Sequence, residues 1–364
     1  MQQEHGVACN GYTQGMVRTG YEQVIAQRTG DIFCFSARKP GTVISVKPNG
    51  IIVQYEDGEV KGVETGRRYG SDSGLVFAHN VKTNYKVGDS FNKGDVLTYN
   101  EGFFEPDFFN PKNMVWKQGV MVNTVLLEST QTLEDASSIS RKLASKLTTK
   151  TTKVKIVKLT FDQVVRNMVT AGTPVNHETI LCVIEDAVTS NSNLFDEVSL
   201  DTLRILSSQT PTAKVQGVVE RIEVYYHGDK EDMSDSLRAI ADASDRTFAE
   251  QAKAAGKKAY TGEVGEELRF DGDPLTFETL AIKFYITTDV PSGVGDKGVF
   301  SNQMKTVFSE VMDYEVTTER GEVVDAIFGA KSILDRIVLS PILIGTTNKL
   351  LELIAAKAVD VYFE

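Results

Sequence analysis

The chain has 364 residues, which is enough for two or three compact units with a sizeable core. Its 41% hydrophobic and 24% charged residues are ordinary for a globular protein and exclude wholesale disorder. A formal net charge of −11 argues against a free-standing nucleic-acid-binding protein that relies on bulk electrostatics, although local basic strips inside a larger assembly stay open.

Residues 1–150 are predicted to be mostly strand and loop. Two alternating runs, Gly41–Lys47 and Gly50–Glu56, flank a Pro-Asn-Gly sequence that is typical of a tight turn between strands. The segment Gly102–Lys112 carries four phenylalanines and two prolines, too interrupted for a helix. We expect an ordered loop packed by its aromatic rings.

From about residue 151 the pattern changes. Thr151–Leu159 is rich in β-branched residues and predicts a strand, and Val215–Tyr226 predicts a longer one. Asp235–Lys257 has the composition of a helix, with apolar residues at three- and four-residue steps. Because this apolar face is thin and the rest is charged, we predict an exposed helix between strands, as in a protruding arm.

The last third of the chain returns to strand. Leu275–Thr287 predicts a strand that feeds a glycine-rich loop. Val323–Ile337 and Asn348–Val359 are apolar enough for two buried helices. The chain as a whole is therefore expected to be a mixed α/β, β-rich protein.

The cysteines and the termini bear on the compartment. Cys9, Cys34 and Cys182 are widely spaced without a CxxC pair, and the four histidines are scattered, which favours buried, reduced thiols over a disulfide framework or a zinc site. No apolar run approaches the roughly 18 residues of a membrane span. The N-terminus lacks the layout of a signal peptide. We expect an intracellular, cytoplasmic protein.

The loop Pro291–Ser301 holds three glycines and Lys297. Glycines let a backbone approach a ligand closely, and the ammonium group of Lys297 is suited to phosphate oxygens. Taken alone, such a loop more often contains turn-forming glycines and a solvated lysine. It is not a P-loop, because the G-x-x-x-x-G-K-[ST] spacing is absent and a strand is expected to follow.

The sequence of this loop is specific, however. Gly295–Ser301, GDKGVFS, resembles the GNKGVIS-type segment of the β subunit of bacterial multisubunit DNA-directed RNA polymerases. Leu280–Thr287 resembles the strand that precedes this segment in the family. Val338–Ile344 resembles the family's VLNPLGV and leads into a segment with a Leu-Glu pair, Leu351 and Glu352.

Weaker landmarks follow the family's order across nearly the whole chain, which supports the resemblance more than any single match. Gln131–Ser140 resembles YNFEDSILVS, and Lys117–Leu127 stands in the place of GQNMRVAFMPW. The others are Gly94–Leu97 for GDVL, Met16–Glu22 for PLVGTGME, and Val81–Asn84 for TRSN.

This resemblance implies a double-psi β-barrel with a protruding flap domain. Residues 1–150 would supply the first part of the β-side barrel, and residues 270–364 its second part, with the Gly-rich Lys loop and the terminal helices. Residues 151–269 would form the flap, a β-rich arm over the RNA exit path that carries the exposed helix. In the family the flap also docks an initiation factor, which a helix with a thin apolar stripe suits.

The resemblance also implies residue roles. Nucleotide addition needs an aligned 3′ hydroxyl, Mg²⁺ ions and cationic clamps. Lys297 would face the RNA 3′ end, and Glu134 with Asp135 match a catalytic carboxylate pair near the second Mg²⁺, although adjacent carboxylates alone more often form a solvated turn. Lys82 replaces an arginine that contacts the incoming triphosphate, with loss of the bidentate fork. Other candidate contacts to substrate or nucleic acid are Asn84, Gly295, Gly298, Gln303, Lys305 and Lys349.

Two cations of the family pattern are missing. An earlier lysine of the family falls on Asp289, where Lys283 or Lys305 would substitute only if the fold brings either close. The arginine that follows Val-Pro-Ser in the family falls on Thr347, two residues before Lys349. The segment Ala326–Arg336 is interpreted as an insertion.

Phe270–Asp273 is similar to part of NADFDGD, the metal-binding motif of the other large subunit, β′. The Asn-Ala-Asp prefix and the third carboxylate are missing, and two aspartates around a glycine more often form a turn. Mg²⁺ is therefore expected to be bound mainly by an aspartate triad on a β′-like partner.

The expected function is that of a subunit of a multisubunit DNA-dependent RNA polymerase, the C-terminal portion of a split β subunit that is inactive alone. Its expected partners are a β N-terminal-like subunit, β′-like subunits, the DNA template, the RNA transcript, NTPs and a sigma-like initiation factor. The chain opens with Met where a bacterial β subunit is mid-sequence, and such splits are typical of giant tailed bacteriophages. The expected location is then the host cytoplasm or the virion.

A second hypothesis is a non-catalytic double-psi barrel protein of the virion or of transcription regulation. Asp289 and Thr347 favour it, whereas Lys297 with Glu134 and Asp135 argues against it. A self-sufficient polymerase is excluded by the missing aspartate triad.

Overall fold

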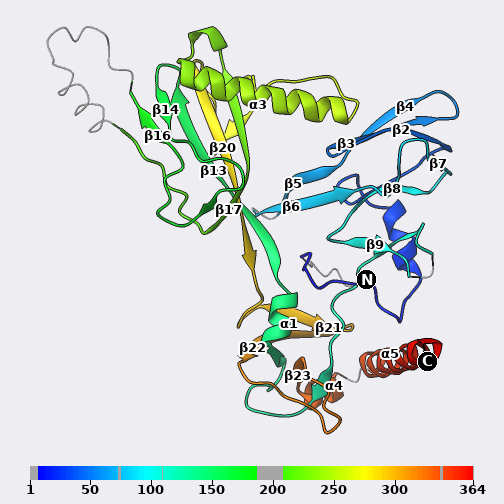
Figure 1. Ribbon diagram of the computed structural model, residues 1–364. Helices are drawn as coiled ribbons and strands as arrows, with labels where there is room; N and C mark the ends of the chain where they lie inside the picture. The colour runs from blue at the N-terminus through cyan, green and yellow to red at the C-terminus, as the bar shows by residue number, and fades with distance from the viewer. Residues whose placement is uncertain (1–6, 73–74, 109, 187–207, 337–338, 364) are drawn as a thin grey trace. The chain divides into compact units, whose positions relative to one another are not determined.

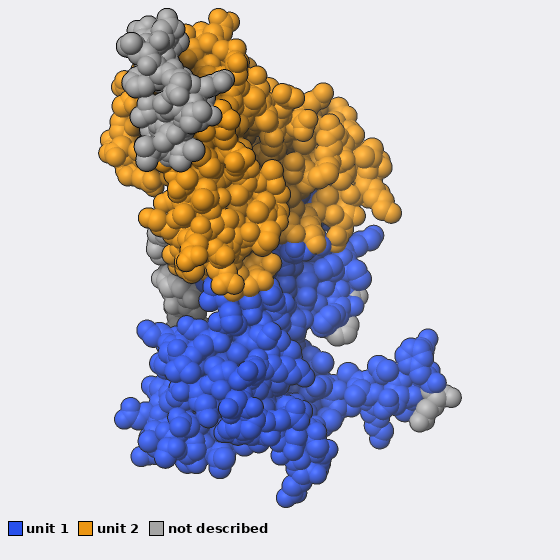
Figure 2. All heavy atoms as spheres, turned by 60° about the vertical axis from the view of Figure 1, so that its left-hand side comes forward, with its two compact units in different colours: residues 1–38, 92–149, 290–364 blue, residues 39–91, 150–289 orange. Residues whose placement is uncertain are grey.

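A computed structural model describes residues 7–72, 75–108, 110–186, 208–336 and 339–363 (Figure 1). Strands predominate, and most of their pairings are antiparallel. The chain divides into two compact units, each built from separate segments (Figure 2). Unit 1 comprises residues 1–38, 92–149 and 290–364, and unit 2 comprises residues 39–91 and 150–289. The expected segments 1–150, 151–269 and 270–364 do not coincide with these units.

Unit 2 contains a four-stranded antiparallel sheet in the order β4-β3-β2-β7. Its strands are β2 (Gly41–Lys47), β3 (Gly50–Tyr55), β4 (Val60–Glu64) and β7 (Ser90–Phe91). The predicted hairpin is confirmed, because β2 pairs with β3 across the Pro-Asn-Gly turn. Alternation along these strands buries Val43, Ile51 and Val53.

The longer strands of unit 2 pair in the order β6-β13-β20-β17-β15, and β5 also pairs with β6. The predicted strands in residues 151–159, 215–226 and 275–287 correspond to β13, β17 and β20 and are confirmed. The bounds are β5 (Gly66–Asp72), β6 (Leu75–Lys82), β13 (Thr149–Thr160), β15 (Pro174–Val175), β17 (Gly217–His227) and β20 (Thr279–Val290).

Two small antiparallel strand pairs complete unit 2. One joins β14 (Val164–Arg166) to β16 (Val183–Glu185), and the other joins β18 (Arg269–Phe270) to β19 (Asp273–Pro274). The turn between β18 and β19 holds Asp271 at φ 53° and Gly272 at φ 94°, both in the left-handed region. The Phe270–Asp273 sequence thus forms a tight turn, as its composition favoured.

Helix α3 (Asp235–Ala254) follows the short 3₁₀ helix η3 (Lys230–Asp232) in unit 2. Its Ser234 cap accepts a hydrogen bond from the backbone N–H of Leu237. The expectation of an exposed helix is wrong for one face: Leu237, Ala241 and Phe248 are all buried. The thin apolar stripe packs on β17, the strand that precedes the helix in the chain, and the charged face remains outside.

The first part of unit 1 is a set of short strands and 3₁₀ turns. They are η1 (Tyr21–Gln23), η2 (Ile25–Gln27), β1 (Cys34–Ser36), β8 (Val96–Asn100), β9 (Phe104–Pro106) and β10 (Met114–Trp116). The predicted aromatic packing of the 102–112 segment is confirmed for Phe103 and Phe104, whose ring centroids lie 5.4 and 5.3 Å from that of Trp116. Phe108 is instead 62% exposed, and residue 109 lies outside the described residues. All three cysteines are free and buried, as predicted.

The second part of unit 1 is a five-stranded mixed sheet in the order β11-β23-β12-β22-β21. Two short helices cover one face of it: Leu143 of α1 packs against Phe308, and Ile333 of α4 packs with Met304. The bounds are β11 (Thr124–Leu126), β12 (Ala136–Ser140), α1 (Arg141–Lys146), β21 (Lys297–Phe300), β22 (Met304–Met312), β23 (Ala326–Phe328) and α4 (Ala330–Asp335).

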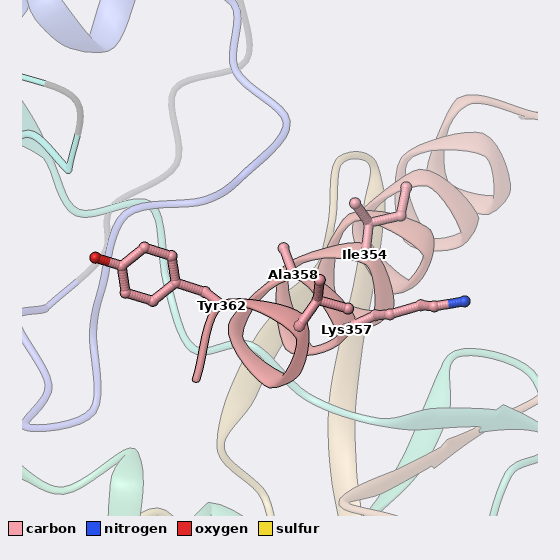
Figure 3. A pocket seen from close by; sticks show the side chains of 5 residues that line it. Ile354, Lys357, Ala358 and Tyr362 are labelled. Atoms are coloured by element: carbon pink, nitrogen blue, oxygen red, sulfur yellow. The ribbon is translucent and has the colours of Figure 1, made fainter. Parts of the chain in front are cut away.

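The prediction of two buried C-terminal helices is wrong. Residues 323–337 contain β23 and α4 rather than one helix, and residues 348–359 lie within α5 (Ser340–Phe363), whose only buried described side chain is Pro341. Figure 3 shows a shallow apolar hollow on α5, lined by Ile354, Lys357, Ala358, Val361 and Tyr362. Apolar composition predicted burial, but the large apolar side chains of this helix, such as Leu343, Leu350 and Tyr362, are exposed.

Two further points concern the whole described chain. None of its helices combines the length and apolar character that crossing a membrane requires. Its strands form open sheets, and among the residues described no sheet closes into a barrel.

Candidate functional site

The open face of the five-stranded sheet in unit 1 carries the sequence-predicted lysines. Burial alternates along β22, with Met304, Thr306 and Phe308 buried and the residues between them exposed. Because α1 and α4 both pack on the buried side, the opposite side of β21 and β22 is uncovered by described elements. Side chains on this side are therefore available to a ligand or a partner.

Lys297 and Lys305 lie on this open face. β21 and β22 form an antiparallel hairpin in which Lys297 is opposite Val307, and Val299 is opposite Lys305. Directly opposite residues point to the same side of a sheet, so the two ammonium groups share one face. Both side chains are exposed, and neither makes an ion pair with a residue that the structure describes.

The register of β12 brings the predicted carboxylate pair to the same end of the sheet. β12 runs parallel to β22, and Ala136 of β12 is paired with Val307 of β22. On the other edge of β22, the same Val307 is paired with Lys297 of β21. The Val307 N–H donates to the Asp135 carbonyl at 3.0 Å, and the Thr306 hydroxyl donates to it at 2.8 Å. Two strand spacings separate the backbones of Lys297 and Ala136, or about 10 Å.

Glu134 and Asp135 occupy the turn before β12. Glu134 has φ 53°, in the left-handed region that non-glycine residues seldom adopt, and both side chains are exposed. The Asp135 carboxylate is not free, because it pairs with the guanidinium of Arg336. Arg336 also donates to the Gln303 carbonyl at 2.8 Å, in the turn between β21 and β22.

Arg336 is a functional candidate that the sequence analysis missed. It lies just after α4, inside the segment interpreted as an insertion, and it connects two predicted residues, Asp135 and Gln303. A lone arginine after a short apolar stretch carries no sequence signal of its own. Its pairing with Asp135 depends on how α4 packs against the sheet.

The glycines of the loop differ in what they do. A Cβ on Gly298 would lie 2.5 Å from the Phe308 ring, so only glycine fits at this position against the buried side of the sheet. Gly295 has φ 92°, and a Cβ there would meet no atom within 4 Å, so conformation rather than space requires glycine. The loop is closed by Asp296, whose carboxylate accepts from the Gly293 N–H at 2.8 Å.

Lys349 lies elsewhere in unit 1, on α5. Its ammonium contacts Glu322 at 3.0 Å and Glu352 at 3.4 Å, and it donates to the side-chain oxygen of Asn123 at 3.2 Å. The hydrogen bond to Glu322 is the main cause that raises the pKa of Lys349. Its charge is already balanced, which weakens its expected role as a phosphate contact.

The remaining predicted residues are placed as follows. Lys82 ends β6 and Asn84 follows it, both in unit 2, whereas the residues described above lie in unit 1. Asp289 pairs with Lys150 at 3.4 Å within unit 2. Thr347 is exposed on α5. Lys283, the suggested substitute cation, lies in unit 2 between the rings of Tyr225 and Phe270, at 4.9 and 4.7 Å from their centroids.

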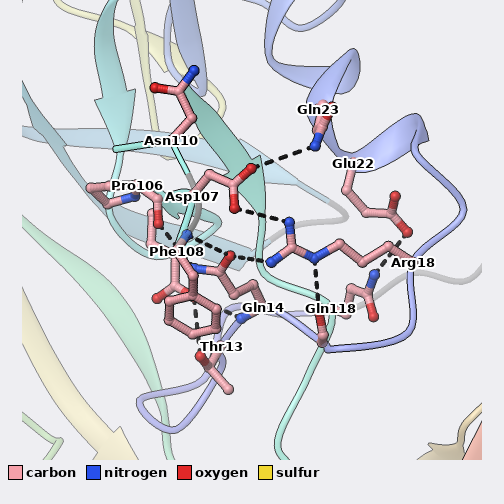
Figure 4. Close-up of polar contacts among 12 residues, drawn as sticks. Thr13, Gln14, Arg18, Glu22, Gln23, Pro106, Asp107, Phe108, Asn110 and Gln118 are labelled. Atoms are coloured by element: carbon pink, nitrogen blue, oxygen red, sulfur yellow. Dashed lines mark hydrogen bonds and ion pairs between the residues drawn. The ribbon is translucent and has the colours of Figure 1, made fainter. Parts of the chain in front are cut away.

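A second polar cluster in unit 1 involves the segment that resembles PLVGTGME (Figure 4). Arg18 pairs with the buried Asp107 at 3.1 Å and donates to Gln14 and to the Gly15 carbonyl. Gln14 is itself buried and donates to the Pro106 carbonyl. Because the Arg18 guanidinium is engaged on all sides by protein atoms, this cluster ties residues 13–23 to the β9 region rather than offering a ligand site.

The donor set on the open face does not fit Mg²⁺ by itself. Mg²⁺ requires near-octahedral oxygen ligands, commonly from one or two carboxylates with phosphates and waters. Here Asp135 is committed to Arg336, and Glu134 is a single exposed carboxylate. Over the described ranges, no group of three or more His, Cys, Asp or Glu side chains is arranged to hold a metal ion.

Comparison with known proteins gives no family for this chain. No family model matches the sequence, and no curated protein matches it significantly.

Proposed function

We propose that this chain is the C-terminal portion of a split β subunit of a multisubunit DNA-dependent RNA polymerase. The observation that carries the proposal is the register of β12, β22 and β21, which gathers the Glu134-Asp135 turn and the Lys297 loop at one end of one open sheet face. The Lys297 loop has the most specific resemblance to the family, the Glu134-Asp135 turn has a weaker one, and the two are far apart in the sequence.

The chemistry of the face agrees with phosphoryl transfer. That reaction is catalysed chiefly by positioning and by charge stabilisation around the transferred phosphate, not by covalent chemistry from the protein. Lys297 would stabilise negative charge beside the RNA 3′ end and the reacting phosphate, and Lys305 adds charge on the same side. Arg336 supplies a guanidinium at the turn between β21 and β22, and Asp135 holds it in place.

The proposal extends to the fold and the partners. The β-rich units would belong to a double-psi β-barrel and its surroundings, with residues 151–269 as the flap over the RNA exit path. The aspartate triad that binds Mg²⁺ would come from a β′-like subunit, with Glu134 near the second ion. A β N-terminal-like subunit, template DNA, transcript and NTPs complete the assembly, and a sigma-like factor would dock on the flap.

A non-catalytic barrel protein of the virion or of transcription regulation is the second candidate. It is favoured by the ion pairs that occupy Lys349 and by the ion pair between Asp289 and Lys150. The two positions where the family has phosphate-binding cations, Asp289 and Thr347, therefore have no available cation beside them, because Lys150 and Lys349 are already paired with carboxylates. The uncovered Lys297 and Lys305 favour the polymerase instead.

The test is an affinity purification of the tagged full chain from its natural source, with mass spectrometry and an RNA synthesis assay on the eluate. We expect a subunit with the aspartate triad and template-dependent RNA synthesis. Lys297→Ala in that assembly is expected to lower synthesis by about 100-fold or more. Lys112→Ala, an exposed lysine of unit 1, is the matched control. Full activity of the Lys297 variant, or recovery of the chain with virion structural proteins alone, would favour the second candidate.

A further inference from the structure

One stretch of the chain has a charge opposite to that of the whole. Between Asp135 and Asp162 there are seven lysines and arginines and no aspartate or glutamate, in a protein of net charge −11. Four of these cations, Lys150, Lys153, Lys155 and Lys158, lie in unit 2 on strand β13. The neighbouring strand β6 also lacks carboxylates.

The lysines of β13 are poorly neutralised. Lys153 is exposed and Lys155 half-buried, and neither has an ion-pair partner in the part of the chain that the structure describes. Lys150 pairs with Asp289 at 3.4 Å and Lys158 with Asp273 at 3.9 Å. The two aspartates are 61% and 81% exposed, so these pairs contribute little.

Lys153 and Lys155 also share one side of the strand. Residues two apart on a strand point to the same face, with their Cα atoms about 6.6 Å apart. Like charges on one face repel each other, and no carboxylate on β13 or β6 relieves the repulsion. A bound polyanion would remove this cost and gain the release of its counterions.

The surroundings favour a nucleic acid over an acidic protein. None of the large hydrophobic side chains that the structure shows exposed belongs to β13. Protein interfaces have an apolar core and are depleted in lysine, whereas nucleic-acid backbones are bound largely by lysine and arginine. We propose that β13 binds the phosphate backbone of a nucleic acid, with Lys153 and Lys155 at the centre of the contact.

This surface is additional to the open face of unit 1 and needs neither a partner subunit nor catalysis. Contacts to phosphates carry no base specificity, so the binding is independent of sequence and strongly dependent on salt. If β13 fails to bind RNA in the assay, the proposed polymerase function is unaffected. If the polymerase function is disproved, the proposed binding by β13 is likewise unaffected.

The experiment is fluorescence anisotropy of the full chain with a labelled single-stranded RNA of about 20 nucleotides, titrated at several salt concentrations. The Lys153→Ala/Lys155→Ala variant is expected to bind about tenfold more weakly at low salt. Its slope of log K against log salt is expected to be smaller by about 1.4, or about 0.7 for each lost contact. A duplex DNA of equal length in a parallel titration shows which form of backbone is preferred.

Two controls isolate the position of the charges. Lys47→Ala/Lys61→Ala removes two exposed lysines of the same unit that lie on β2 and β4, and should bind like the unchanged protein. Lys153→Arg/Lys155→Arg keeps the charge and should retain affinity. Equal weakening by both alanine pairs overturns the proposal, as does displacement of RNA by polyglutamate at equal charge concentration, which would indicate an acidic protein partner.

Discussion

The guanidinium of Arg336 pairs with the carboxylate of Asp135, and it also holds the turn of the β21-β22 hairpin through the Gln303 carbonyl. The side chains of Asp135 and Arg336 are 58% and 30% exposed. A pair so exposed contributes little to folding, so its loss is expected to act on binding more than on stability.

Arg336→Ala is therefore expected to lower the free energy of unfolding by about 1 kcal/mol or less, measured by urea denaturation. Under the proposed polymerase function, RNA synthesis by the reconstituted assembly is expected to fall far more, because Arg336 would supply positive charge to the phosphates. Arg320→Ala, at an exposed loop position in unit 1, should change neither quantity. A purely structural role would show as a loss of stability with the rate of synthesis unchanged.

Gly298→Ala tests the packing beneath the Lys297 loop. The added Cβ would meet the Phe308 ring at 2.5 Å, in a side chain that is 5% exposed. Overpacking of this kind costs about 1–3 kcal/mol, read from the urea midpoint. Gly293→Ala in the same loop meets no atom within 4 Å and should be tolerated. Equal stability of the two variants would contradict the register of β21 on β22.

Alkaline pH is expected to destabilise unit 2 through Tyr226. Burial, followed by the hydrogen bond to Asp245, raises the pKa of Tyr226 to about 12. The folded state therefore keeps a proton that the unfolded state releases near its ordinary pKa of about 10. The resulting stabilisation is complete below pH of about 10 and is lost as the pH rises toward about 12.

The measurement is the urea midpoint between neutral pH and pH of about 12 for the unchanged protein and for Tyr226→Phe. The variant is expected to be less stable at neutral pH, because the 3.0 Å hydrogen bond to Asp245 is lost. It is also expected to lose less stability on the alkaline side. Parallel pH curves for the two proteins would rule out Tyr226 as a contributor.

Substitutions on helix α5 are expected to change the solubility of the protein without changing its stability. Leu350 and Ile354 are 56% and 54% exposed, so Leu350→Ser/Ile354→Ser should change the free energy of unfolding by about 0.5 kcal/mol or less. Self-association of the isolated chain, followed by light scattering, should decrease because an exposed apolar surface is removed. Ile139→Ser, at a fully buried position, should destabilise the protein strongly. A large loss of stability in the α5 variant would show that the helix is packed.

The sequence predicted those parts of the fold whose signals are local. The β2-β3 hairpin followed from its Pro-Asn-Gly turn, and β13 from its β-branched residues. The sequence predicted that α3 is exposed and that the C-terminal helix is buried, and the structure shows a buried face on α3 and an exposed α5. The reason is that burial depends on which elements pack against a helix. The thin stripe of α3 packs on β17, whereas the large apolar side chains of α5 are exposed.

The candidate site was predicted as a set of residues but not as an arrangement. Lys297, Asp135 and Gln303 were identified from their resemblance to a family, whereas their proximity depends on the parallel pairing of β12 with β22, which no local pattern specifies. Arg336 was missed for the same reason. The balanced charge of Lys349 also depends on Glu322, which lies in a separate loop.

The order of the strands in the sheet has a consequence for synthesis on the ribosome. Both neighbours of β12 in its sheet, β22 and β23, come later in the chain, and the Thr306–Asp135 hydrogen bond spans 171 residues. At about 5–20 residues per second, β12 emerges on the order of ten to thirty seconds before β22 is translated. During that interval the nascent chain exposes two unpaired strand edges, which makes it a natural substrate for chaperones and a point of vulnerability to aggregation when expressed at high level.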